Sequence, residues 1–164
     1  MYAERRVIMQ KKLIGFFLIF ASILMLVVKT QLAPITSFIS WPFLLFFVSV
    51  ILIAVSFTNQ NDKLALGAGI AAAIGLFIWG KQYVDGWSNH WSILLMLIGF
   101  AVFLQFFINK QNLTAVIASI LTLSGICAWP GLNDIASLAS IAPTLNTYWP
   151  VLFLGLGLYF IIRK

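Results

Sequence analysis

Few side chains in this sequence could carry acid–base or metal chemistry, and they are scattered. The acidic residues are Glu4, Asp62, Asp85 and Asp134, and His90 is the single histidine. No two of these carboxylates are close in sequence, so a carboxylate pair or a histidine metal site would need distant segments to converge. The sequence has no phosphate-binding loop motif. We therefore expect no cofactor and no enzymatic activity.

The strongest candidate for a polar site is a group of loop residues: Lys81, Asp85 and His90, with Asp134 from a later loop. An enzyme working at a membrane interface could use Asp85 and His90. The alternative, which we favour, is a set of hydrated loop residues in which Asp85 balances Lys81. The lone Cys127 can form neither an internal disulfide nor a cysteine metal site. We expect it to behave as a small buried hydrophobic side chain.

The composition predicts that these loops belong to a membrane protein. The chain has 164 residues, of which 62% are hydrophobic and 9% charged. A soluble domain carries roughly 25% charged residues, and a small one could not bury this much apolar surface. The net charge is +6, but the basic residues lie at the ends of apolar runs. Membrane orientation explains this charge better than nucleic-acid binding, so we expect the lipid bilayer as partner and no nucleic acid.

Six apolar runs lack any acidic, basic or histidine residue. They are Leu13–Val28, Trp41–Phe57, Leu64–Trp79, Trp91–Ile108, Leu113–Trp129 and Tyr148–Ile162. A spanning helix needs about 20 residues, which most runs reach when their polar and aromatic ends are added. Backbone groups in lipid must be satisfied within the segment, so each run should be helical. The predicted fold is an all-α integral membrane protein with six transmembrane helices in a single membrane domain.

The breaks between runs predict which ends share a side of the membrane. Thr58–Lys63 and Asn109–Asn112 are short polar stretches typical of tight helical turns. The longer breaks Lys29–Ser40, Gly80–His90 and Pro130–Thr147 should lie on the opposite side.

The basic residues then orient the chain. The side of the short turns and termini holds Arg5, Arg6, Lys11, Lys12, Lys63, Lys110, Arg163 and Lys164, and the long loops hold only Lys29 and Lys81. This bias predicts a multi-pass protein of the bacterial inner membrane with both termini, including the basic segment 1–12, in the cytoplasm. A cleaved signal peptide over Leu13–Val28 is the alternative for the first run.

Three apolar runs begin alike, at segments 40–45, 90–95 and 148–153. The shared features are a tryptophan suited to the headgroup layer and, in two copies, a proline in the first helical turn. These interface anchors are Trp41, Pro42, Trp91, Trp149 and Pro150. We read them as the second helices of three tandem helical hairpins, 13–57, 64–108 and 113–162. Independent selection of Trp-Pro at membrane interfaces is the alternative.

The first and last hairpins resemble the LiaI/LiaF-like transmembrane region of bacterial cell-envelope stress proteins, best over residues 13–57 and 148–164. The resemblance rests on Gly15–Phe20 followed by Phe38–Leu45, and on Tyr148–Pro150 continuing to Lys164. It implies a non-catalytic role in sensing or membrane organisation near envelope-stress kinases. The soluble C-terminal domain of LiaF-type members does not follow Arg163-Lys164 in this sequence, which argues against direct regulation of a kinase.

The run Leu64–Trp79 carries two stripes of small residues with a four-residue spacing. One is Gly67, Ala71 and Gly75, and the other is Ala65, Gly69 and Ala73. Small residues let helix backbones approach closely, so we expect this helix to be central, with neighbours on two sides. The alternative is a dimer interface through one stripe.

Hydroxyl residues inside the runs should bond to their own helix; they are Ser22, Ser49, Ser119, Thr122 and Ser124. In the last long loop, Asn133 or Asp134 should cap a short surface helix that Pro143 ends. Together these features favour an envelope-stress accessory, a scaffold or a regulatory partner, acting with another membrane protein or with itself as a homo-oligomer. The alternative is a small permease, a channel or the membrane subunit of a transporter.

Overall fold

The computed structural model describes residues 34–135 and 137–162, and residues 15, 18, 21, 22, 25, 26, 29 and 30 before them. The predicted first helix, Leu13–Val28, lies largely outside the described residues, although those of its residues that are described are helical. The basic segment 1–12 and the last two residues also lie outside them.

Every regular element in the described part of the chain is helical, and no strand occurs there. The α-helices are α2 (Trp41–Asn59), α3 (Asp62–Tyr83), α4 (Trp91–Asn109), α5 (Asn112–Cys127), α6 (Ala142–Tyr148) and α7 (Pro150–Ile162). Two short 3₁₀ helices, η1 (Ile35–Ile39) and η2 (Pro130–Asp134), precede α2 and follow α5. The all-helical prediction is therefore confirmed for the described residues.

Three of these helices are long and apolar enough to cross a membrane. They are α2, α3 and α4, with 19, 22 and 19 residues. Helices α5 and α7 have 16 and 13 residues, which correspond to about 24 and 20 Å against a hydrocarbon core of about 30 Å. The protein is membrane-associated through at least the three long helices, and the six crossings stay a prediction.

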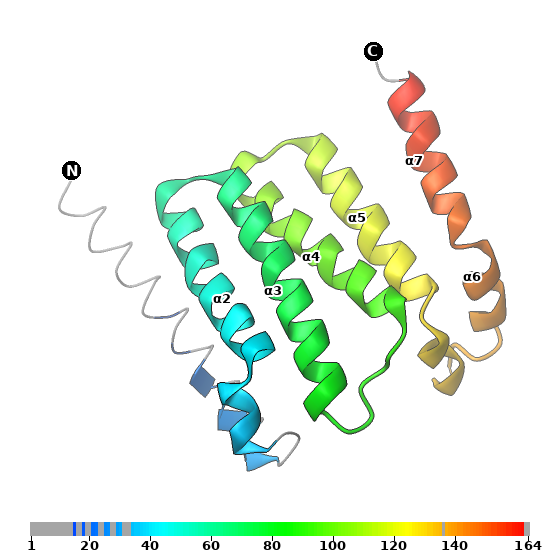
Figure 1. Ribbon diagram of the computed structural model, residues 1–164. Coiled ribbons are helices and arrows are strands. Elements are labelled where there is room, and N and C mark those ends of the chain that lie inside the picture. The colour runs from blue at the N-terminus through cyan, green and yellow to red at the C-terminus, as the bar shows by residue number, and fades with distance from the viewer. Residues whose placement is uncertain are drawn as a thin grey trace.

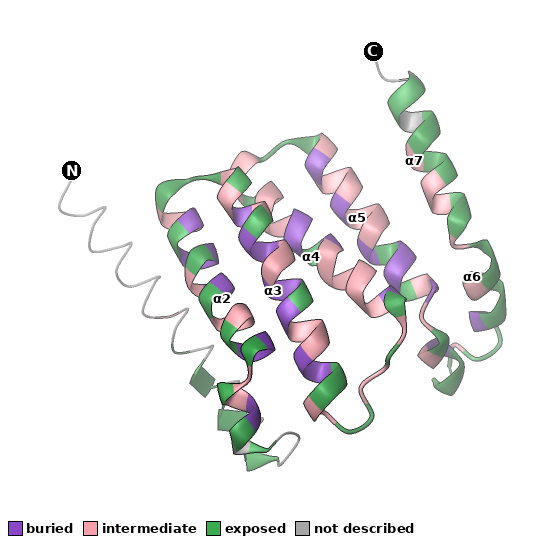
Figure 2. Ribbon diagram, in the orientation of Figure 1, coloured by how far each residue is buried: buried purple, intermediate pink, exposed green. Residues whose placement is uncertain are grey.

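The four helices α2 to α5 form an antiparallel bundle in which chain neighbours are also spatial neighbours (Figure 1). Helix α3 lies between α2 and α4, and α5 packs on α4. Helix α7 lies beside α5 with much sparser contact. Figure 2 shows the result as burial: each bundle helix carries buried positions, whereas α7 is mostly exposed.

Helix ends at the two short turns follow local backbone chemistry. Helix α2 stops at a left-handed residue, Gln60 (φ 53°), and α4 stops at Lys110 (φ 54°). The Asn61 side chain then accepts a hydrogen bond from the Leu64 N–H at 3.0 Å and so caps α3. In the first turn the left-handed residue is thus followed by a side-chain cap, which reverses the chain within a few residues. In the second turn Gln111 precedes α5 without a side-chain cap, and its N–H donates to the Asn109 side chain instead. Both turns are tight, as the polar sequence indicates.

The last long loop differs from its prediction. Pro143 lies in the first turn of α6 and so begins a helix instead of ending one. A proline costs least in the first helical turn, where its missing N–H has no partner in any case. Asn133 and Asp134 are the last residues of η2, and the Asn133 side chain donates to the Pro130 carbonyl instead of capping a following helix.

Candidate functional site

Lys81, Asp85 and His90 lie where α3 ends and α4 begins. Asp134 is the last residue of η2, after α5, at the same end of the bundle. Lys81, Asp85 and Asp134 are exposed, and His90 is partly buried. Among the described residues, no group of three or more His, Cys, Asp or Glu side chains could hold a metal ion.

His90 serves as the N-cap of α4. Its Nδ1 accepts a hydrogen bond from the Ser92 N–H at 3.3 Å and lies 2.7 Å from the Ser92 hydroxyl. Its ring also lies against Trp91, with 5.4 Å between ring centroids. These contacts turn the imidazole towards the helix start, so the structure gives His90 a structural role.

Replacing His90 with alanine should destabilise the protein by about 1 kcal/mol, because α4 loses its cap. Asparagine is a strong N-cap residue, so His90→Asn should keep most of the stability. Reversible unfolding in detergent measures both values. Asp85→Asn is the matched control from the same loop and should change little; an effect equal to that of His90→Ala would argue against the capping role.

All six tryptophans lie at this same end of the bundle. Trp41 and Trp91 begin helices, and Trp149 immediately precedes α7. Trp79 lies near the end of α3, and Trp87 and Trp129 follow α3 and α5. Sequence reasoning identified the first three and missed the others, although their places beside the long loops were visible. Tryptophan prefers the membrane–water interface, so this end is marked as a headgroup-level surface.

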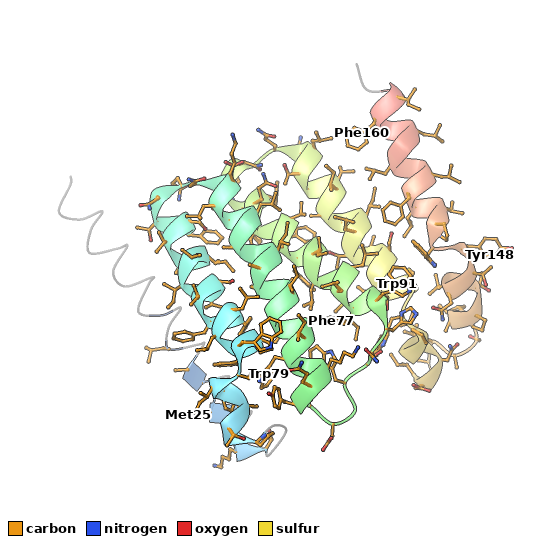
Figure 3. All side chains as sticks on the ribbon, in the orientation of Figure 1. Met25, Phe77, Trp79, Trp91, Tyr148 and Phe160 are labelled. Atoms are coloured by element: carbon orange, nitrogen blue, oxygen red, sulfur yellow. The ribbon has the colours of Figure 1, made fainter. Side chains whose placement is uncertain are left out.

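Trp79 joins the first long loop to the bundle. It is 6% exposed, and its Nε1–H donates to the Ser37 carbonyl of η1 at 3.2 Å. Its ring lies 5.8 Å from the rings of Phe38 and Phe43. Figure 3 shows Trp79 near the end of α3, facing the η1–α2 corner. The loop is therefore packed onto the bundle through an aromatic cluster.

A second aromatic contact joins α7 to the bundle. The ring of Trp91, at the start of α4, lies 5.2 Å from the ring of Trp149. Trp149 also contacts Phe153 of α7 at 5.9 Å. Two of the three tryptophans among the predicted anchors thus contact each other at the tryptophan-rich end.

The opposite end is polar and links the two short turns. The Gln105 side chain of α4 donates to the Asp62 carboxylate of α3 at 3.3 Å, and the Asn109 amide donates to the Thr114 hydroxyl at 3.0 Å. The Lys110 ammonium lies 5.5 Å from the centroid of the Phe107 ring. This end combines hydrogen-bonded polar side chains with cations.

The small residues of α3 divide between two neighbouring helices. A Cβ on Gly69 would lie 2.8 Å from the Cβ of Ala101 in α4, and a Cβ on Gly75 would lie 2.8 Å from the Phe46 nitrogen in α2. Ala65 and Ala73 of the second stripe are buried.

The first stripe needs a correction at Gly67, which is exposed and has open space around it; Ala71 is only partly buried. Buried Ala68 and Ala72 pack with Ile53 of α2, so they and Gly75 form the contact with that helix.

The hydroxyl residues behave in two ways. Ser22, Ser49 and Ser119 each donate to the carbonyl four residues earlier, as expected. The hydroxyls of Thr122 and Ser124 are buried without a hydrogen-bond partner. Both belong to α5, whose buried face packs on α4.

The fold and these contacts define a class: a helical, membrane-associated protein with a tryptophan-rich end and a polar end. No protein-family model, curated protein or solved structure matches the chain. The resemblance to the LiaI/LiaF-like region therefore gains no support from these comparisons.

Proposed function

We propose that the chain is a multi-pass protein of the bacterial inner membrane that acts as a non-catalytic scaffold or regulatory partner, of the envelope-stress accessory kind. The observation that carries this proposal is the close packing of backbones in the α2–α5 bundle. At Gly69, Gly75, Gly99 and Gly125 an added Cβ would lie within 3.0 Å of atoms of the neighbouring helix. Helices in such contact form a stiff unit, which suits a platform better than a moving carrier.

The proposed topology has six crossings with both termini in the cytoplasm. The tryptophan-rich end then faces outwards, and the turns carrying Lys63 and Lys110 face the cytoplasm. The polar site of Lys81, Asp85, His90 and Asp134 supports loop structure in this proposal and takes no substrate.

A partner test separates the scaffold role from transport. The protein is purified in mild detergent from its native membrane, alongside Trp41→Ala, which alters an exposed residue of the tryptophan-rich end. The scaffold role predicts that one membrane protein co-purifies in fixed stoichiometry. Trp41→Ala should weaken this association while the bundle stays folded. Absence of any such partner, together with solute flux in liposomes, would contradict it.

The second candidate is a small permease, a channel or the membrane subunit of a transporter. It is favoured by the unpaired hydroxyls of Thr122 and Ser124, because buried polar groups without partners are costly and often functional. Transport predicts solute flux in liposomes that falls with Thr122→Val and Ser124→Ala. If solute flux with the wild type and with both variants equals the leakage of liposomes without protein, transport is excluded for the solutes tested.

A further inference from the structure

Two stretches of the chain, 41–80 and 91–130, align without gaps at a shift of 50 residues. Ten positions are identical. The pairs are Trp41/Trp91, Leu44/Leu94, Leu45/Leu95, Phe57/Phe107, Asn59/Asn109, Ala65/Ala115, Ala68/Ala118, Ile70/Ile120, Gly75/Gly125 and Trp79/Trp129. The shift matches α2 to α4 and α3 to α5. Each repeat unit is therefore a helix pair joined by a short turn, α2–α3 or α4–α5, and not a pair joined by a long loop as in the hairpins predicted from sequence.

The structure repeats its contacts at the same shift. A Cβ on Gly75 would lie 2.8 Å from the Phe46 nitrogen, and a Cβ on Gly125 would lie 2.6 Å from the nitrogen of Met96, the counterpart of Phe46. Helices α2 and α4 both have 19 residues, and their left-handed C-caps also lie 50 residues apart. The α2–α3 and α4–α5 pairs are therefore two copies of one packing unit.

The two units meet through α3 and α4. Gly69 lies against Ala101, which is 2% exposed, and the Asp62 carboxylate accepts a hydrogen bond from Gln105. In a repeat protein each unit carries both halves of such an interface, one on its first helix and one on its second. The half on α2 of the first unit and the half on α5 of the second unit therefore stay unused.

Within the described part of the chain, residues of both unused halves are exposed. On α2, the counterpart of Gln105 is Val55, which is 38% exposed, and Leu52 beside it is 39% exposed. On α5, the counterpart of Asp62 is Asn112, which is exposed, and the counterpart of Ala73 is Leu123, which is 49% exposed. Helix α7 lies beside α5 and contacts it far more sparsely than α4 does (Figure 2).

We propose that these halves bind each other between two copies of the chain, so that the α2 face of one copy receives the α5 face of the next. The occupant of the α2 face must present the kind of surface that α3 presents to α4, and α5 of a second copy carries its counterpart. The contact is head-to-tail, which builds a ring or an open array. This inference does not depend on the scaffold role, because it rests on the repeated units alone.

Cysteine cross-linking in the membrane tests the proposal. In a Cys127→Ala background, one tagged copy carries Val55→Cys and a differently tagged copy carries Asn112→Cys, and both are co-expressed and oxidised. We expect a disulfide-linked dimer containing both tags. The internal counterpart, Asp62→Cys with Gln105→Cys in one chain, is the positive control for the chemistry, because those side chains contact each other.

The matched control replaces Val55→Cys with Phe107→Cys, an exposed position of α4 outside the proposed face. Little dimer should form from Phe107→Cys with Asn112→Cys. The proposal is overturned if the Val55 pair gives no dimer while the internal control links, or if the Phe107 pair links equally well, which would indicate random collision.

Discussion

Replacing Trp79 with alanine should lower the free energy of unfolding by about 3–5 kcal/mol, the usual range for removing a large core aromatic side chain. Trp79 packs against both Phe38 and Phe43 and donates to the Ser37 carbonyl. Its loss would leave a cavity and release η1 from the end of α3. Reversible unfolding in mixed detergent micelles gives the value.

Two variants separate the parts of this effect. Trp79→Phe keeps most of the packing but loses the indole donor, so about 1 kcal/mol should be lost. Trp41→Ala removes a tryptophan that is exposed in the bundle and should have little effect in detergent. Equal losses for Trp79→Ala and Trp41→Ala would contradict the packing of the first long loop on α3.

Replacing Gly75 with leucine should cost about 3 kcal/mol, at the upper end of the range for overpacking. The Gly75 Cβ position lies 2.8 Å from both the Phe46 nitrogen and the Pro42 carbonyl oxygen. A side chain there must push α2 away from α3, since the obstructing atoms belong to the backbone. The same unfolding assay measures the loss, and Gly125→Leu should give a similar one in the second unit.

Gly67→Leu is the matched control for this prediction, because it is the same change in the same helix. No atom lies within 4 Å of the Gly67 Cβ position, and leucine is the better helix former. Its stability should therefore equal or exceed that of the wild type. A loss as large as that of Gly75→Leu would mean that α3 packs through a different face.

The sequence predicts the helix starts and short turns well because local chemistry decides them. Trp41 and Trp91 begin helices, as their suitability for the interface and the following apolar runs indicate. Asn61 caps α3 through its own side chain. Such features need no knowledge of neighbouring helices.

The packing face of α3 could not be read as reliably, because a four-residue spacing is not the period of a helix. Each four-residue step turns about 40° beyond a full turn, so Gly67 faces about 80° away from Gly75. The residues that meet α2 follow steps of four and three: Ala68, Ala72 and Gly75. Which of several small-residue stripes is used depends on the neighbours, which the sequence does not specify.

The polar residues illustrate the same limit. His90 shares a loop with Asp85, and sequence proximity made the two the strongest candidates for a polar site, with hydrated loop residues as the favoured interpretation. The structure instead pairs the imidazole with Ser92 at the helix start. Backbone direction at the cap decides where the ring points, and residue spacing alone does not reveal it.

One labelling experiment decides whether the α2–α5 bundle crosses the bilayer. Single cysteines replace Lys63, Lys110 and Lys81 in a Cys127→Ala background, and a membrane-impermeant maleimide is applied to sealed vesicles of known orientation. The bundle predicts that positions 63 and 110 react from one side and position 81 only from the other. Reaction of 63 and 110 from opposite sides, or of all three from the same side, would contradict it.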